Sequence, residues 1–278
     1  MMKCDLHIHS NYSSGTQSLE DILLEAKEKG IGLISITDDD TTAAYDELPE
    51  AAEKHGVSWL RGLQVTSMFG GMLFRFVVYG YAPTNVKLQE LLALNRKEWD
   101  HMGLIIIEEL EELYPELSAK EYLEYKHPFG AGGFKHNGYL KSRGFDGTEN
   151  GTIKLFMQHR EDILPRLKEL KFPPVNEVID IAHSAGGKVI VQSGYLRNPE
   201  TIREDLDKIV AFGADGIEAY CASVKPELRE VLINYAKEKN LLITGGGDGH
   251  GDFADKNMYD IGIIDIDDSQ LELGGLWH

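Results

Sequence analysis

The first third of the chain alternates short apolar segments with polar, helix-forming stretches. Cys4 to His9 alternates apolar and polar positions, as a half-buried β-strand does, and Gly32 to Thr37 is an apolar run typical of a buried strand. Between them, residues 18–30 begin with a capping serine and end with glycine, which predicts a helix. Val57 to Ser67 and Met72 to Tyr81 flank a Phe-Gly-Gly sequence, so we expect a β-hairpin there.

The middle of the chain has a different pattern. Residues 85–114 have the periodicity of one long amphipathic helix, residues 127–138 form a Gly-rich loop, and helix resumes at about 153–171. We therefore expect residues 85–174 to be a mostly helical insertion. It would pack on an α/β domain made of residues 1–84 and 175–278.

The last third returns to alternating helices and strands. The predicted helices are 175–185, 199–212 and 226–240, and the predicted strands are 188–193, 215–220, 241–244 and 261–266. Strands that alternate with helices over such a length require right-handed crossovers. The sequence therefore predicts a mostly parallel sheet or barrel.

Composition and charge narrow the class of protein. The chain has 278 residues, of which 42% are apolar, and a formal net charge of −18. Such an acidic envelope repels long nucleic acids, whereas a small phosphorylated molecule can still enter a locally positive site. The two cysteines, Cys4 and Cys221, lack the spacing of a thiolate metal site or a disulfide framework. The apolar runs are too short to cross a bilayer, and the start of the chain has no signal-peptide pattern, so we expect a cytoplasmic protein.

Polar side chains recur where the predicted strands end. They are His7 and His9, the triple Asp38-Asp39-Asp40, Gln64, Gln192, Glu218, and Asp248 with His250. In parallel α/β folds the carboxyl ends of the strands meet on one face, where such enzymes place their chemistry. We expect these side chains to converge on one site.

The spacing of the histidines suggests a metal ion. His7 and His9 are two residues apart on a strand, so both imidazoles point to the same face and suit Zn, Mn or Fe. Asp248-Gly249-His250 follows a Gly-rich segment and offers one oxygen and one nitrogen donor. The alternatives are a solvent-facing histidine pair and a flexible glycine turn.

Other polar groups have two interpretations each. The three aspartates could bind a cation or cap the next helix, and capping is the better interpretation for Asp40. Lys135 and His136, in the Gly-rich loop, could reach an anionic ligand or simply be solvated.

These motifs together resemble the PHP (polymerase and histidinol phosphatase) family, in particular its compact phosphoesterases. The family's D-L-H-x-H-S-x-x-S-D-G is similar to the segment Asp5 to Gly15, its T-D-H-D-T to Thr37 to Thr41, and its G-x-E to Gly62 to Gln64. Its H-x-x-G-x-x-x-x-P motif is matched loosely by Arg75 to Pro83, and its A-H-P-G motif corresponds to Val191 to Gly194. Its G-I-E-V-Y motif corresponds to Gly216 to Tyr220, and its G-S-D-F-H-G motif to Gly246 to Gly251. The resemblance implies a distorted TIM-like (β/α)7 barrel.

The resemblance also implies a reduced metal site. The family's three-metal centre keeps His7, His9, Asp248 and His250 here, whereas Ser14, Asp39, Gln64, Arg75 and Gln192 replace the family residues. Arginine cannot ligate a metal, so a pair between Arg75 and Asp39 is expected to take the place of a second ion. One divalent ion (Zn, Mn or Fe) would then lie on His7, His9 and Asp248, with Gln64 as a weak oxygen ligand.

The remaining expected roles follow from this centre. His250, beside Gln192, could bind a further ion weakly or act as a general acid or base, and Gln192, Glu218 and Asp39 line the site. Arg75, Lys135, His136 and Arg197 are candidates to hold a phosphate. Two functions fit: a metal-dependent phosphoesterase acting on small phosphorylated compounds, or a non-catalytic relative that binds a ligand or partner.

Overall fold

The strands form two sheets. The computed structural model describes residues 1–196, 198 and 200–277, so the position of Arg197 lies outside the described residues. One sheet is parallel, with the order β1 (Lys3–Ile8), β2 (Ile31–Ile36) and β3 (Ser58–Trp59). The other has the order β4 (Gly62–Phe69), β5 (Met72–Tyr79), β6 (Lys188–Gln192), β7 (Gly216–Tyr220) and β8 (Leu242–Gly245).

The expected hairpin is present and sets the direction of one strand. β4 and β5 pair antiparallel from Gly62–Tyr79 to Phe69–Met72, and Gly70 and Gly71 have positive φ in the turn. β5 is also antiparallel to β6, whereas β6, β7 and β8 are parallel. Because β5 runs against its neighbours, its first half lies at the edge where β6, β7 and β8 end.

The α/β class is confirmed; in place of the expected distorted (β/α)7 barrel, the described strands form sheets of three and five strands that do not close into one barrel. Among the described residues, no continuous strand pairing joins the two sheets; their backbones meet at isolated bridges, Ile8 with Gly249 and Asp39 with Gln64. The predicted strand at 261–266 does not form. Gly262 takes φ +68 and donates its N–H to the Asp5 carboxylate, so this segment turns instead of adding a strand.

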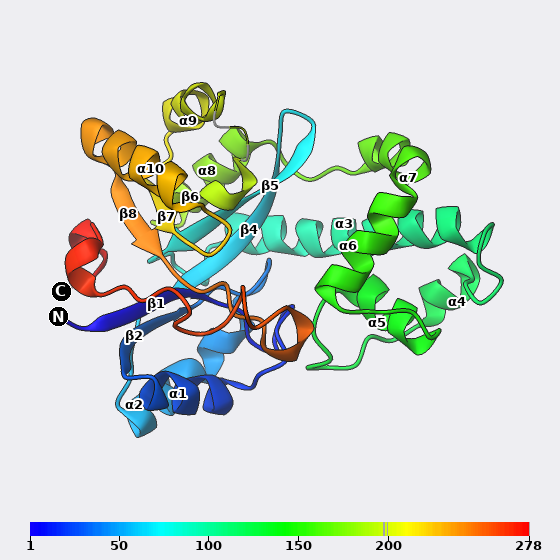
Figure 1. Cartoon of the computed structure of the whole chain (residues 1–278), viewed down its shortest axis with the longest axis horizontal. Coiled ribbons are helices and arrows are strands. Elements are labelled where there is room, and N and C mark those ends of the chain that lie inside the picture. Colours follow the sequence, from blue (N-terminus) through cyan, green and yellow to red (C-terminus); the bar gives the residue numbers. More distant parts are fainter. Residues whose placement is uncertain (197, 199, 278) are drawn as a thin grey trace.

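Helices cover both sheets. In Figure 1, α1 (Leu19–Glu28) and α2 (Leu48–His55) lie beside β1 and β2, and α8 (Val175–Ser184), α9 (Ile202–Ala211) and α10 (Pro226–Lys239) lie against the five-stranded sheet. Ser18 caps α1 as predicted, accepting from the Asp21 N–H, and the Asp21 side chain completes a capping box. Short 3₁₀ helices span Ala43–Asp46, Leu167–Glu169, Ser193–Tyr195, Gly251–Phe253, Asp268–Gln270 and Gly274–Leu276.

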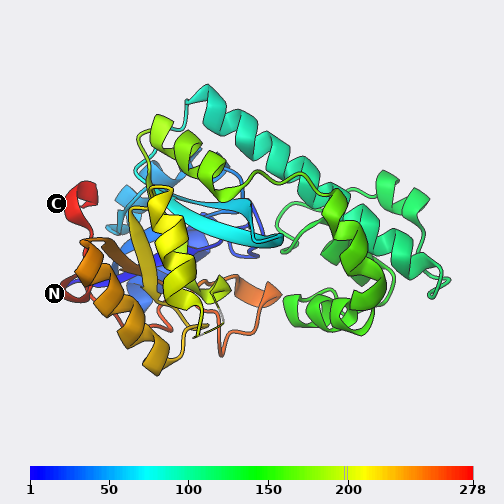
Figure 2. The ribbon, with the colours of Figure 1, turned by 90° about the horizontal axis from the view of Figure 1, so that it is seen from above.

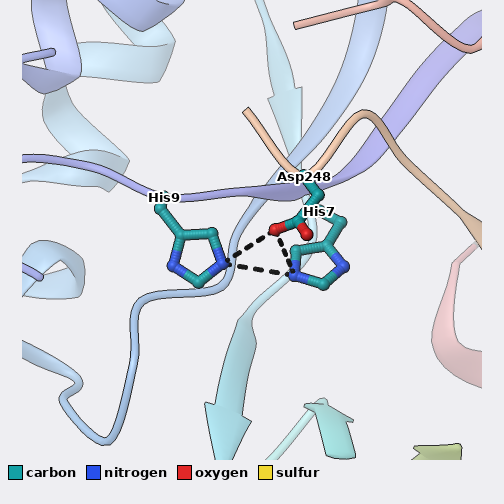
Figure 3. Close-up of side chains that lie close together, drawn as sticks. All are labelled: His7, His9 and Asp248. Carbon is teal, nitrogen blue, oxygen red and sulfur yellow. Dashed lines mark hydrogen bonds and ion pairs between the residues drawn. The ribbon is translucent and has the colours of Figure 1, made fainter. Parts of the chain in front are cut away.

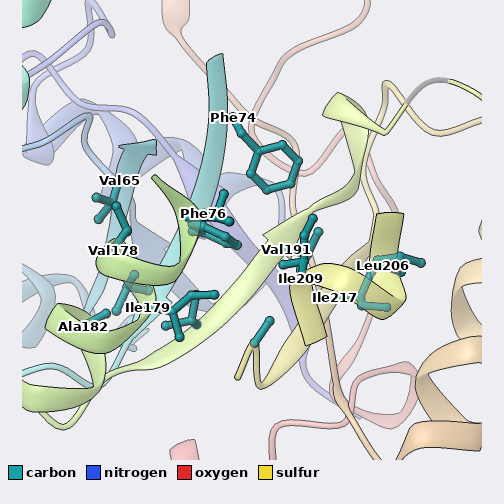
Figure 4. Close-up of a cluster of buried hydrophobic side chains, with 14 of the residues drawn as sticks. Val65, Phe74, Phe76, Val178, Ile179, Ala182, Val191, Leu206, Ile209 and Ile217 are labelled. Carbon is teal, nitrogen blue, oxygen red and sulfur yellow. The ribbon is translucent and has the colours of Figure 1, made fainter. Parts of the chain in front are cut away.

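A large apolar core fixes the five-stranded sheet to its helices. Figure 4 shows Val178 and Ile179 of α8 and Ile209 of α9 close to Phe76 and Val191 of the sheet. All five side chains are fully buried, and burying each stabilises the fold by roughly 1.5–3 kcal/mol. The core therefore holds the strand ends in fixed positions.

Between β5 and α8 the chain is helical. The elements are α3 (Val86–Glu111), α4 (Ala119–Glu124), α5 (Lys135–Ser142), α6 (Glu149–Gln158) and α7 (Arg160–Arg166). In Figure 2, α3 extends from the sheet to the other four helices, whose core includes Tyr139 and Ile163. The start of α3 also packs into the core of the five-stranded sheet, through Leu88 and Leu92. The boundaries at 85 and 174 remain a prediction.

Candidate metal centre and adjoining cavity

Three side chains from two distant parts of the chain meet at the edge of the first sheet. His7 lies on β1, His9 follows the strand, and Asp248 lies in the loop after β8. The loop comes close because it has glycines: a Cβ on Gly246 would overlap the His7 backbone, and Gly249 bridges to Ile8. The glycines therefore allow the loop to approach β1 closely.

The donor atoms of these three residues point to one place. Nε2 of His7 lies 3.2 Å from Nε2 of His9. Asp248 Oδ1 lies 3.2 Å from the Nε2 atom of His7 and 3.3 Å from the Nε2 atom of His9. Figure 3 shows the Asp248 carboxylate facing both imidazoles. All three donor atoms lie within 4.8 Å of one another, as they must to share an ion.

Each imidazole has a carboxylate behind it. His7 Nδ1 lies 2.6 Å from Glu218 Oε1, and His9 Nδ1 lies 3.2 Å from Asp39 Oδ2. In a neutral imidazole, an N–H on Nδ1 directed at a carboxylate leaves the lone pair on Nε2, and this arrangement is common behind metal-ligating histidines. Glu218, expected only to line the site, therefore orients the His7 imidazole.

The charge balance of the cluster also fits a cation. Burial lowers the pKa of His9, but the Asp39 and Asp248 carboxylates outweigh it and raise that pKa to about 10. The pKa of Asp248 is held well below its usual range: burial raises it, and the imidazoles of His7, His250 and His9 outweigh that effect. Asp248 Oδ1 is buried and lies against the two imidazoles, 3.2 Å from His7 Nε2 and 3.3 Å from His9 Nε2. Two imidazole nitrogens and a buried carboxylate oxygen are a donor set suited to a divalent ion.

Gln64 is turned away from the role of an oxygen ligand. Arg75 Nη1 donates to Gln64 Oε1 over 2.7 Å, and because arginine only donates, this contact fixes which end of the amide is oxygen. Gln64 Nε2 then lies 2.9 Å from His7 Nε2 and donates to Gln192 Oε1 over 3.2 Å. In this orientation Gln64 presents a donor, and only a flip of the amide would offer its oxygen.

Arg75 also meets Asp39, as the sequence predicted. Its Nη1 lies 3.1 Å from Asp39 Oδ1, and its guanidinium carbon lies 5.1 Å from the centre of the Trp99 ring. Burial raises the pKa of Asp39, but the charges on His9 and Arg75 outweigh it and lower that pKa strongly. A permanent cation thus neutralises a carboxylate next to the three donor atoms.

His250 lies on the other side of His9. The two rings stack with centroids 4.1 Å apart, and His250 Nδ1 donates to the backbone oxygen of Asp248 over 2.6 Å. Burial and the nearby His9 lower the pKa of His250 to about 4. His250 is therefore neutral at pH 7 and has its lone pair on Nε2. With His9 and Asp39 it forms a second group close enough to hold an ion.

The neighbouring aspartates have structural tasks. Asp38 accepts hydrogen bonds from Ser10 and Ser13 and holds the loop after β1. Asp40 accepts from Thr66 of β4 and from Asn95 and Trp99 of α3. The expectation that Asp40 caps the next helix is wrong, because its carboxylate instead ties α3 to the sheet.

A small cavity joins the cluster to the helical region. Its volume is about 150 Å³, and its polar lining comes from both sides: Ser14, Arg75 and His250 on one, and His136, Asn137, Glu149 and Thr152 on the other. A larger pocket of about 470 Å³ lies beside it and shares Trp99 and Phe134, whose rings stack 4.0 Å apart.

The candidate phosphate ligands are divided between these two spaces. Lys135 and His136 lie on the first turn of α5, so the expectation of a loop there is wrong. His136 lines the small cavity and is buried, with a pKa lowered to about 4 by burial and by His127, whereas Lys135 lines the larger pocket. Sequence reasoning missed Glu149, Trp99 and Phe134, which lie in the helical region without a recognisable motif.

Comparison with known proteins places this geometry in a family. A model of the PHP domain matches residues 5–169. The chain belongs to the PHP domain family. A solved structure from Bifidobacterium adolescentis, described as a metal-dependent phosphoesterase, superposes on this PHP protein with a TM-score of 0.77 at 26% identity, over 96% of this chain and 93% of the other.

Curated relatives of this PHP protein have different substrates. The 5′-3′ exoribonuclease of Haemophilus influenzae is 25% identical over 89% of this chain and 90% of its own length. The 3′,5′-nucleoside bisphosphate phosphatase of Chromobacterium violaceum is 30% identical, over 32% of this chain and 31% of its own. An RNA-cleaving relative means that the expected exclusion of nucleic acid stays a prediction. None of the described helices is long and apolar enough to span a membrane.

Proposed function

We propose that this protein is a metal-dependent phosphoesterase that hydrolyses small phosphorylated compounds with one divalent ion. The observation that supports it most is the meeting of His7 Nε2, His9 Nε2 and Asp248 Oδ1 within 3.2–3.3 Å, with a carboxylate behind each imidazole. These three residues would hold the ion. Such an ion supplies Lewis-acid stabilisation and lowers the pKa of a water molecule.

The chain's own residues would position the phosphate. Arg75 lines the small cavity and uses Nη1 for Gln64 and Asp39, whereas its Nη2 and Nε groups have no hydrogen-bond partner among the described residues. Those groups can donate to phosphate oxygens, for which the guanidinium geometry is well suited. His250 Nε2, which carries a lone pair, can accept a proton in the same cavity.

The single-ion centre follows from the same network. A second ion near Asp39 would lie against the Arg75 guanidinium, which keeps its proton and repels a cation. The Gln64 amide lacks the charge with which a carboxylate bridges two ions. We therefore assign one ion to His7, His9 and Asp248.

A phosphate-ester panel with added Mn²⁺ or Zn²⁺ tests the proposal. We expect turnover of at least one small phosphomonoester, about one bound ion per chain, and loss of both in His9→Ala. Absence of turnover on every ester, with less than one bound ion, would instead support a non-catalytic binding protein.

The exoribonuclease relatives give a second candidate, cleavage from the 5′ end of RNA. A 5′-phosphorylated oligoribonucleotide belongs in the same panel. A net charge of −18 favours the small ester, because a long polyanion is repelled at low salt. Faster turnover of the oligonucleotide than of every small ester would favour the second candidate.

A further inference from the structure

Phosphate-ester hydrolysis needs a proton for the leaving oxygen, and the residues described so far do not supply it. His250 directs its Nδ1–H at the Asp248 backbone oxygen, so its Nε2 can accept a proton but has none to give. Arg75 cannot lose its proton under any ordinary condition. His136 is buried and neutral, and a neutral imidazole is not an acid.

The small cavity has one more titratable side chain, Glu149. It is the first residue of α6, follows the capping residue Thr148, and lines the cavity together with Arg75 and His250. No hydrogen bond or ion pair to another described residue occupies its carboxyl group. An unpaired, half-buried carboxyl facing a cavity lined by arginine and histidine is available to a ligand.

The position of Glu149 matches the geometry of the reaction. The ring of His250 stacks on His9, so His250 lines the side of the cavity that lies next to the proposed ion site. Glu149 lines the cavity from the helical region. In an in-line displacement the entering and leaving oxygens lie on opposite sides of phosphorus, so the group that protonates the leaving oxygen is expected away from the ion.

We propose that Glu149 is the general acid, giving its proton to the leaving oxygen of the phosphate ester bound in this cavity. The inference rests on the proposed phosphoesterase function. As the new P–O bond to water forms, the bond to the leaving oxygen breaks, and its electron pair takes the proton from Glu149. The carboxylate is then reprotonated by the proton that the attacking water has released, so the net reaction is ester hydrolysis to alcohol and phosphate.

The surroundings of Glu149 favour its protonated form. Burial and the negative charge of Asp248 raise the pKa of Glu149, and Asp39 adds to the rise. Arg75 and His9 act in the opposite direction, and His136 faces the same cavity as a neutral ring. A bound phosphate adds further negative charge, which again favours the acid form.

The experiment compares two substrates in Glu149→Gln, with Glu161→Gln on exposed α7 as the matched control. One ester has an alkyl alcohol as leaving group, which needs a proton, and the other has p-nitrophenol, which leaves as a stable anion. We expect kcat to fall about 10²–10⁴-fold for the alkyl ester and less than tenfold for the p-nitrophenyl ester. Glu149→Asp, which keeps the acid, should recover part of the alkyl-ester rate.

A metal-free measurement accompanies the kinetics. Carboxyl ¹³C NMR of the metal-free protein should show Glu149 titrating above the ordinary glutamate range, and this signal should be absent in Glu149→Gln. An equal fall in kcat for both esters, or a change in KM alone, would overturn the role of Glu149 while leaving the phosphoesterase proposal standing. A wild-type protein that turns over neither ester would overturn both.

Discussion

The Nδ1 atom of His7 lies 2.6 Å from Oε1 of Glu218, and both side chains are fully buried. His7 lies on β1 of one sheet and Glu218 on β7 of the other, so this contact joins the two sheets at the candidate metal centre. Because the carboxylate holds the imidazole with Nε2 directed at Asp248, the contact ties the fold to the chemistry.

Glu218→Gln should therefore weaken ion binding. The amide keeps the shape of the side chain but loses the charge that orients His7 and increases its basicity, so we expect Zn²⁺ affinity to fall about 10–100-fold. Competition with a chelating dye measures this, with the exposed Glu177→Gln as control. Unchanged affinity in Glu218→Gln would show that His7 does not depend on Glu218.

The contacts of Arg75 with Gln64 and Asp39 predict that replacing Arg75 and Gln64 creates a site for a second ion. In the double variant Gln64→Glu/Arg75→His, a carboxylate and a neutral imidazole replace the amide and the guanidinium that now meet at 2.7 Å. We expect bound metal to rise from about one to about two ions per chain by elemental analysis, because the repelling cation is gone and a bridging carboxylate is present. A stoichiometry that stays at one would contradict the idea that Arg75 takes the place of an ion.

Ion binding should release protons. In the metal-free protein the pKa of His9 is about 10, so at pH 7–8 its imidazole holds a proton that a bound ion must displace. Apparent affinity should therefore rise as pH increases and level off above about pH 10. Calorimetry at one pH in two buffers of different ionisation enthalpy measures the released protons. An identical heat in both buffers would contradict the assignment.

His136 should make the protein sensitive to acid. The pKa of His136 is about 4 in the folded protein and an ordinary 6.5 in the unfolded chain. Between pH 6.5 and pH 4 the unfolded chain therefore binds more protons, and the free energy of unfolding falls as pH falls. Above pH 6.5 the effect vanishes. In His136→Gln, the free energy of unfolding from urea titrations should fall less between pH 6.5 and 4.5 than in wild type. Parallel pH profiles for the two proteins would contradict this.

Much of the site could be predicted from the sequence because its residues follow strands. His7, His9, Gln64, Gln192, Glu218 and Asp248 lie on strands or directly after them, and the pairing of strands decides which ends meet. The Arg75–Asp39 pair was predicted from charge and from the family pattern, and the structure shows it.

The rest depends on packing between distant segments. Glu149 and Phe134 have no motif, and their place at the cavity depends on how the helical region packs on the sheet, to which Asn95 and Trp99 of α3 contribute by donating to Asp40. Residues 261–266 have the apolar pattern of a buried strand, but Gly262 has positive φ and donates its N–H to the Asp5 carboxylate, so the chain turns there. A distorted (β/α)7 barrel was expected. In the structure Asp40, after β2, has φ +47, and the pairing between this segment and β4 is an isolated bridge between Asp39 and Gln64.

Anomalous diffraction from crystals soaked in Zn²⁺ or Mn²⁺ tests the central claim most directly. We expect a single strong peak within coordination distance of His7 Nε2, His9 Nε2 and Asp248 Oδ1. A peak between Asp39 and Arg75, or none at the three donor atoms at saturating metal, would contradict a one-ion centre built from these residues.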